Sequence, residues 1–165
     1  MKRILLAASA LFAVAAASSA FADDVNGASA TGTAGVTVFT PITVEESQSL
    51  DFGAITSGDA GTVAIDQSTG ARKVSGGVGA IAVNTGRTGG FDVTGEKDAA
   101  INVVVGAAIT GFKDTGIAGK TQADNLPVAL KGTTASFSVG GMLAIPAKTP
   151  AGVYTGQYTV AVNYP

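Results

Sequence analysis

The sequence predicts an all-β protein built as one sandwich domain. No long segment repeats its apolar residues at the helical period of about 3.6. Short apolar runs instead alternate with groups of Gly, Thr, Ser and Asp, and the 23 glycines of the chain favour many turns and closely paired strands. The stretch 151–165 alternates with the period of two that a half-buried strand shows.

The N-terminal 22 residues have the features of a secretory signal peptide. Lys2 and Arg3 provide the positive start, residues 4–16 form an uncharged apolar run, and residues 20–22 (A-F-A) offer the small side chains that signal peptidase needs. We therefore expect secretion, with cleavage before Asp23. The run is short for a membrane-spanning helix, so we expect no membrane insertion after cleavage.

Composition restricts the mature chain, 23–165, to few kinds of protein. It is long enough for one domain with a core of its own. Loss of Lys2 and Arg3 takes the formal net charge from -2 to -4, and a mildly acidic chain without basic clusters is not expected to bind nucleic acid. The chain has no cysteine, so packing and hydrogen bonds must hold the fold without disulfides.

The expected strands follow from apolar runs and the turn residues between them. In chain order they are 36–44, 50–55, 62–66, 73–83, 91–94, 100–105, 126–130, 135–145 and 151–165. The connector 114–124 is the longest and most polar, so we expect a loop there. Pro41 and Pro127 cannot donate a hydrogen bond to a ladder, which places them at strand ends or sheet edges.

The final stretch has one apolar face and one mostly polar face. Its apolar face carries the even-numbered residues Gly152, Tyr154, Tyr158, Val160, Val162 and Tyr164. A strand of about 13 residues spans more than roughly 40 Å. Since no residue after Pro165 returns to pair with its free edge, we expect another polypeptide to cover that edge.

Residues 23–34 form an N-terminal arm ahead of the sandwich, which we place at 35–165. Small residues share one face of this arm by parity: Ala28, Ala30, Gly32 and Ala34. Two interpretations are open, a frayed terminus and a detachable strand.

Both ends of the mature chain resemble chaperone-usher fimbrial subunits. Tyr164 is penultimate, Gly152 is fourteenth from the end, and the face between them alternates. Together with the run L-D-F-G-A-I at 50–55, this ending is similar to the spore-coat-U-like branch and to an uncharacterised bacterial family of secreted pilin-like domains.

The resemblance implies an immunoglobulin-like, pilin-like sandwich that lacks its last strand and so leaves a groove. A periplasmic chaperone fills that groove first, and the arm of the next subunit then replaces it at an outer-membrane usher. The implied partners are these two proteins and neighbouring copies or related subunits, in the periplasm and then at the surface of a Gram-negative bacterium. The implied groove edge and chaperone contact is Gly152, Tyr154, Tyr158, Val160, Val162 and Tyr164, and the implied donor residues are Ala28, Ala30, Gly32 and Ala34.

The size of the donor side chains departs from this pattern. Burial of a large apolar side chain contributes roughly 1.5 to 3 kcal/mol, so an arm of alanines and glycine completes a core less firmly than valines would. Val36 and Val38 could extend the arm, in which case the first strand of the domain must start later.

No residue pattern indicates catalysis, a metal or a cofactor. The absence of His and Cys excludes Ser-His-Asp and Cys-His triads, zinc sites and thiol redox chemistry. Two weaker hypotheses concern carboxylates. Acid-base work on a glycoside would use Asp51, Asp92, Glu96 and Asp98. A calcium site would lie near Asp59, Asp66 or Asp114, although no D-x-D-x-D-G spacing supports it.

We therefore expect a structural protein and not an enzyme. The alternative is a self-complete, monomeric extracellular module that binds glycan or adheres to a surface. Exposed aromatic side chains on one face would favour that alternative, and the chain has no Trp.

Overall fold

The computed structural model describes residues 27–112, 115–122 and 126–165, so the predicted signal peptide lies outside the described residues. The chain divides into two units, 1–36 and 37–165. Of the first unit, residues 27–36 are extended chain without regular secondary structure. The described residues include no helix that could span a membrane.

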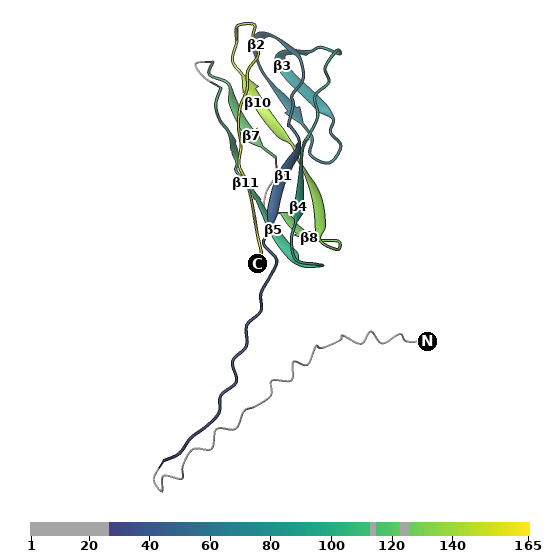
Figure 1. Ribbon diagram of the computed structural model, residues 1–165. Helices are drawn as coiled ribbons and strands as arrows, with labels where there is room; N and C mark the ends of the chain where they lie inside the picture. The colour runs from purple at the N-terminus through teal and green to yellow at the C-terminus, as the bar shows by residue number, and fades with distance from the viewer. Residues whose placement is uncertain (1–26, 113–114, 123–125) are drawn as a thin grey trace, which may run out of the picture. The chain divides into compact units, whose positions relative to one another are not determined.

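The described part of the second unit is all-β, which confirms the predicted fold class, and its strands form three antiparallel sheets (Figure 1). The first sheet has the order β1-β4-β9, formed by Thr43–Gln48, Gly89–Thr94 and Thr134–Val139. The second has the order β3-β2-β10-β7-β6, formed by Arg72–Ala80, Ile55–Ile65, Gly141–Ile145, Ala118–Thr121 and Ala108–Ile109. The third has the order β11-β5-β8, formed by Val160–Asn163, Ala100–Val105 and Leu126–Ala129.

The first and third sheets enclose the first core. β5 alternates strictly, so its odd-numbered residues Ile101, Val103 and Val105 are buried while the residues between them are exposed. They meet Val93 of β4 and Val139 of β9. This face-to-face packing of two alternating faces makes the sandwich.

The second core lies against the second sheet. It contains Val63, Val78, Ile109, Leu143 and Ile145. β9 and β10 are one run of chain that passes from the first sheet to the second at Gly140, where a Cβ would collide with the backbone of Ile65 and Gln67. Tyr158 packs against both cores and joins them.

Several predicted strand boundaries are wrong in ways that concern the later site. The first strand begins at Thr43 and not at 36, so 36–42 is not strand. The run 50–55 is also not a strand, because Gly53 has a φ of 76° and its N–H binds the carboxylate of Asp51, which turns the chain. Regular pairing of the final stretch is confined to β11, with one further bridge at Gln157.

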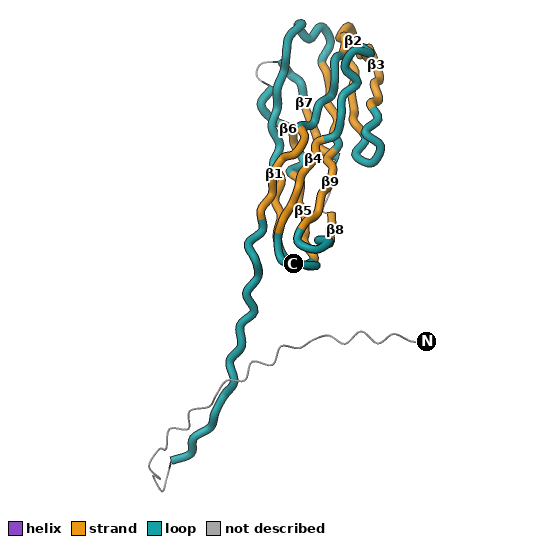
Figure 2. The backbone as a smooth tube through the Cα atoms, turned by 45° about the vertical axis from the view of Figure 1, so that its right-hand side comes forward, coloured by secondary structure: helices purple, strands orange, loops and turns teal. Residues whose placement is uncertain are grey.

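Other differences are smaller. The predicted strand 135–145 is divided into β9 and β10, and β7 lies inside the predicted connector 114–124. Pro127 lies in β8, an edge strand of the third sheet, as its missing N–H requires. Figure 2 shows that loops and turns, drawn in teal, make up much of the backbone between the strands.

Candidate functional site

Two strand edges face a gap in the sandwich. β11 pairs only with β5 and β1 pairs only with β4 among the described strands. Val44 stands opposite Val93 on the inner face of the first sheet, yet Val44 is 38% exposed while Val93 is 0% exposed. Cross-strand neighbours share a face, so the difference shows that this inner face is uncovered beside β1.

The open side of β11 presents alternate backbone groups. Gln157 exchanges both of its backbone hydrogen bonds with Thr110, and the carbonyl of Thr159 accepts from the N–H of Gly106. Backbone groups of a strand point alternately to its two sides. The N–H and C=O groups of the even-numbered residues, Tyr158 to Tyr164, therefore point away from β5, while their side chains face the first core.

A groove of about 1180 Å³, lined by apolar and polar side chains, continues this gap on the N-terminal side of Tyr158. Its two walls are residues 49–57 and 149–158, the segment that leads into β11. Its apolar lining consists of Leu50, Phe52, Ile55, Val63, Ile109, Phe112, Ile117, Leu143, Ile145, Tyr154 and Tyr158. Pockets for small ligands are about 300 to 1,000 Å³, so the volume of this groove exceeds that range and leaves room for a polypeptide segment.

The first wall is held in place by hydrogen bonds that the side chains of Arg72 and Asp51 make. Arg72 donates from Nη1 to the carbonyls of Ala54 and Asn84, at 2.9 and 2.7 Å, and from Nη2 to Ile81. Asp51 accepts from the N–H of Gly53 at 2.7 Å, and this hydrogen bond is the main reason that the pKa of Asp51 lies below its usual value. The wall is thus fixed before any partner arrives.

Most of the second wall, residues 151–156, has no such support. Among the described residues, the backbone of Ala151–Gly156 makes no hydrogen bond to other backbone groups. Tyr154 donates its hydroxyl proton to the carbonyl of Pro150, four residues earlier. An extended segment with strand-like alternation and unpaired backbone groups is a template for strand addition.

The six predicted groove-edge residues divide into two groups. Gly152, Tyr154 and Tyr158 line the groove. Val160, Val162 and Tyr164 pack against the first core instead, beyond the end of the pocket. The predicted donor residues lie in the first unit, within extended chain that belongs to no strand: Ala28, Ala30, Gly32 and Ala34.

Tyr164 fastens the end of β11 to the segment before β1. Its hydroxyl donates to the carbonyl of Thr40 at 2.7 Å and accepts from the N–H of Glu96 at 2.6 Å. Phe39 packs against its ring with centroids 5.1 Å apart. The gap between β1 and β11 is therefore closed at this end within the domain.

We expect Tyr164→Phe to lower the free energy of unfolding by about 1 to 3 kcal/mol, because it leaves two backbone groups without their partner. Tyr154→Phe is the matched control, since it removes one exposed hydrogen bond and should change stability by less than about 0.5 kcal/mol. Urea unfolding of both variants measures the difference. Equal stabilities would show that the hydrogen bonds of Tyr164 do not hold the strand.

Tyr158 buries a hydroxyl that has no hydrogen-bond partner among the described residues. The hydroxyl lies against Gly89, where a Cβ would collide with it, and the ring meets Phe91 edge-on at 6.0 Å. Burial, with a smaller contribution from Glu46, raises the pKa of Tyr158 to about 12. The groove thus ends at a large, desolvated side chain.

We expect Tyr158→Phe to keep or raise stability at neutral pH, because an unpaired buried hydroxyl costs about 1 to 3 kcal/mol. The raised pKa means that the folded state holds this proton longer than the unfolded state does. The resulting stability is complete below about pH 10 and is lost as the pH rises through about 12. Between pH 9 and 12, the free energy of unfolding should fall less steeply with pH for the variant than for the intact protein. Parallel curves for the two proteins would contradict the burial of the Tyr158 hydroxyl.

The carboxylates considered for catalysis or calcium binding do not gather at one place. Five of them make structural hydrogen bonds of their own: Asp51 with Gly53 and Asn84, Asp92 with Ser136, Glu96 with Thr40, Asp98 with Gly132, and Asp66 with Ser68 and Thr69. Asp59 lies in β2, apart from these groups. Hydrogen bonds from Ser68 and Thr69 lower the pKa of Asp66 to about 2. Within 27–112, 115–122 and 126–165, no group of three acidic side chains could hold a metal, and Asp114 lies outside these ranges.

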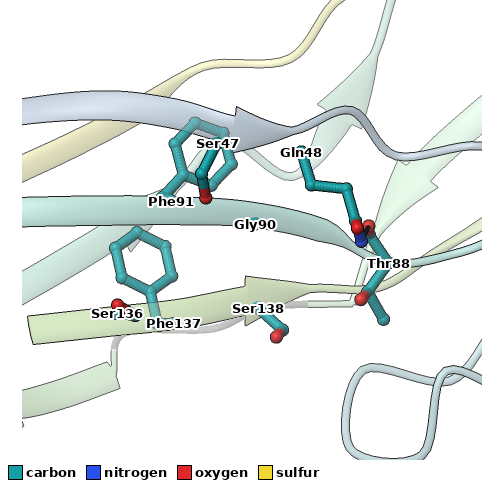
Figure 3. A pocket seen from close by; sticks show the side chains of 8 residues that line it. All are labelled: Ser47, Gln48, Thr88, Gly90, Phe91, Ser136, Phe137 and Ser138. Carbon is teal, nitrogen blue, oxygen red and sulfur yellow. Dashed lines mark hydrogen bonds between the residues drawn. The ribbon is translucent and has the colours of Figure 1, made fainter.

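A second, smaller depression lies over the first sheet (Figure 3). It measures about 270 Å³ and is lined by Ser47, Gln48, Thr88, Gly90, Phe91, Ser136, Phe137 and Ser138. The rings of Phe91 and Phe137 stack at 5.5 Å, but both pack against the first core. They are therefore not available as a flat aromatic platform for a sugar.

Similarity to known proteins covers the domain and not the arm. The family model described as "Domain of unknown function (DUF4402)" matches residues 42–164. The chain belongs to this family. No curated protein and no solved structure matches the chain. The matched segment begins at Ile42 and ends at Tyr164, and both of these side chains pack against the first core.

The sequence did not identify the floor and the first wall of the groove. Leu50, Phe52 and Ile55 belong to the run that was expected to form a strand, and Ile109 lies outside every expected strand. The one usable signal was Gly53 beside Asp51, since that pair favours a turn within an apolar run. Phe112 and Ile117 lie in connecting segments, and only tertiary packing brings them to the groove.

Proposed function

We propose that this DUF4402 chain is a secreted structural subunit of a fimbria-like or other surface assembly, and that neighbouring copies join by strand insertion. One observation carries the proposal. A groove with many apolar side chains lies between two walls, and in the wall that leads into β11 the backbone of Ala151–Gly156 makes no hydrogen bond to the backbone of other described residues. A polypeptide strand would satisfy both the apolar side chains and the free backbone groups.

The proposed contact joins the N-terminal arm of one copy to the groove of the next. Main-chain hydrogen bonds to the open edge of β11 would supply affinity, and alternate side chains would enter the groove. Such a head-to-tail contact does not close on itself, so it produces a fibre. A periplasmic chaperone and an outer-membrane usher are the proposed partners during export, since an open apolar edge needs cover before assembly.

The test is the behaviour of the mature protein on gels. We expect a ladder of multiples when the purified protein is loaded without boiling and a single monomer band after boiling, because an inserted strand leaves only when the domain unfolds. A monomer band in both lanes would contradict strand exchange. It would favour the alternative, a self-complete extracellular binding module.

That alternative has less support. A glycan-binding module usually needs an exposed aromatic surface, whereas Phe91 and Phe137 pack inward at the polar depression. Its concave surface is also far smaller than the groove.

A further inference from the structure

We infer that the inserted strand is residues 28–38 of a second copy, that it runs antiparallel to β11, and that Val36 and Val38 anchor it in the wide part of the groove. This inference rests on the proposed function. It assigns the anchoring role to two valines that follow the arm, in place of the alanines within it.

The groove lies along residues 149–158, and among the described residues none after Tyr158 lines it. We call this stretch the wide end, and its lining includes Leu50, Phe52 and Phe112. The pocket ends at Tyr158. Past Tyr158, Val160 and Val162 pack inward, and Tyr164 binds across to Thr40. Bulky side chains therefore fit only toward the Gly152 end.

The arm has the same taper along its even-numbered face. From Ala28 to Ala34 this face carries only methyl groups and one hydrogen, and Val36 and Val38 then follow on the same face. The two valines are 88% and 82% exposed. Because β1 begins only at Thr43, neither valine belongs to a strand of its own domain. Matching large side chains to the wide end fixes the direction of the arm as opposite to that of β11.

Length, charge and connectivity agree with this direction. The edge from Gly152 to Tyr164 spans about 44 Å and residues 28–38 about 37 Å, at roughly 3.4 Å per residue. Residues 25–44 contain no charged side chain, so the arm itself brings no charge into the groove. The domain of the donor would lie beyond the Gly152 end, away from the Thr40 end, where the chain of the acceptor enters its own domain.

Parity and side-chain size then set the register. The inward residues are even-numbered in the arm and also in 152–164. Residues that stand directly opposite each other share a face, so each even-numbered residue of the arm must stand opposite an even-numbered residue of 152–164. Tyr158 leaves the least room because its hydroxyl is fully buried, and Gly32 is the only inward residue of the arm without a side chain. Gly32 opposite Tyr158 places Val38 opposite Gly152. On the outward face, the same register places Thr33 opposite Gln157, which is exposed.

Cysteine cross-linking tests this register directly, since the chain has no native cysteine. Two differently tagged full-length copies, one with Thr33→Cys and one with Gln157→Cys, are co-expressed with export to the periplasm. Opposed residues lie about 4.5 to 5.5 Å apart between Cα atoms, within the range that a disulfide needs. We expect a dimer that contains both tags, survives boiling without reductant, and disappears when reductant is added. The matched off-register pairs are Thr31→Cys with Gln157→Cys and Thr33→Cys with Thr159→Cys.

The outcomes separate the register from the proposed function. Stronger cross-linking of Thr33→Cys with Gln157→Cys than of either off-register pair supports the register. Equal or stronger cross-linking of an off-register pair overturns the register and leaves strand insertion in place. A boiling-sensitive ladder without cross-linking in any pair overturns residues 28–38 as the occupant. Absence of both ladder and cross-links overturns the proposed function as well.

Discussion

Removal of residues 23–34 from the mature chain is expected to abolish the boiling-sensitive ladder and to leave a folded monomer. The deletion removes Ala28 to Ala34 from the inserted strand. Both cores lie entirely within 42–164, so the free energy of unfolding should change by less than about 0.5 kcal/mol. Gel mobility without boiling and urea unfolding measure the two effects separately.

A mixture of truncated and intact chains provides the control for this deletion. The truncated copy retains its groove, so we expect it to accept an arm and to terminate assemblies at one end. Co-expression should therefore yield complexes of one truncated copy with intact ones, and shorter ladders as its share rises. Normal assembly of the truncated chain alone would show that the arm is not the donor.

Local patterns in the sequence predicted the sheets where a strand has partners within its own domain. β5 matches its predicted range, 100–105, because its alternation between buried and exposed residues is complete. The core residues Val93 and Ile101 also follow from alternation alone. At such positions the period of two and the final packing give the same answer.

Local patterns failed where distant residues decide the conformation. The run 50–55 is apolar enough for a strand, but it turns at Gly53, and Arg72, 18 residues further along the chain, binds the carbonyl of Ala54 beside that turn. The even-odd alternation of the arm continues through Val36 and Val38 toward β1, so parity could not show that the first strand begins at Thr43. Only the sheet pairing with β4 sets that start.

The stretch 151–159 connects the failed prediction to function. Its alternation predicts a strand, and in the structure it has bends at Ala151 and Gly152, no regular pairing up to Thr159, and a single bridge at Gln157. A strand needs a neighbour for its backbone groups, and none of the described residues supplies one for Ala151–Gly156. The proposed assembly rests on this combination of a strand-like pattern with backbone groups that no described residue pairs.

Substitution of both anchoring valines, Val36→Ser with Val38→Ser, should prevent assembly as completely as the deletion does. Burial of each valine contributes roughly 1.5 to 3 kcal/mol, and each 1.4 kcal/mol changes an association constant about tenfold. The loss of both therefore weakens the contact by a factor of roughly 10² to 10⁴. The monomer should keep its stability, because both side chains are exposed in it.

The matched control for the valines is Thr33→Ser with Thr37→Ser. Both threonines lie in the same arm and differ in parity from the valines, so their side chains would point out of the groove. We expect the control to form the same ladder as the intact protein. An unchanged ladder in the valine variant, together with loss of assembly on deletion of 23–34, would return the anchoring role to Ala28–Ala34. Loss of the ladder in the valine variant alone would establish that the strand is held at its wide end.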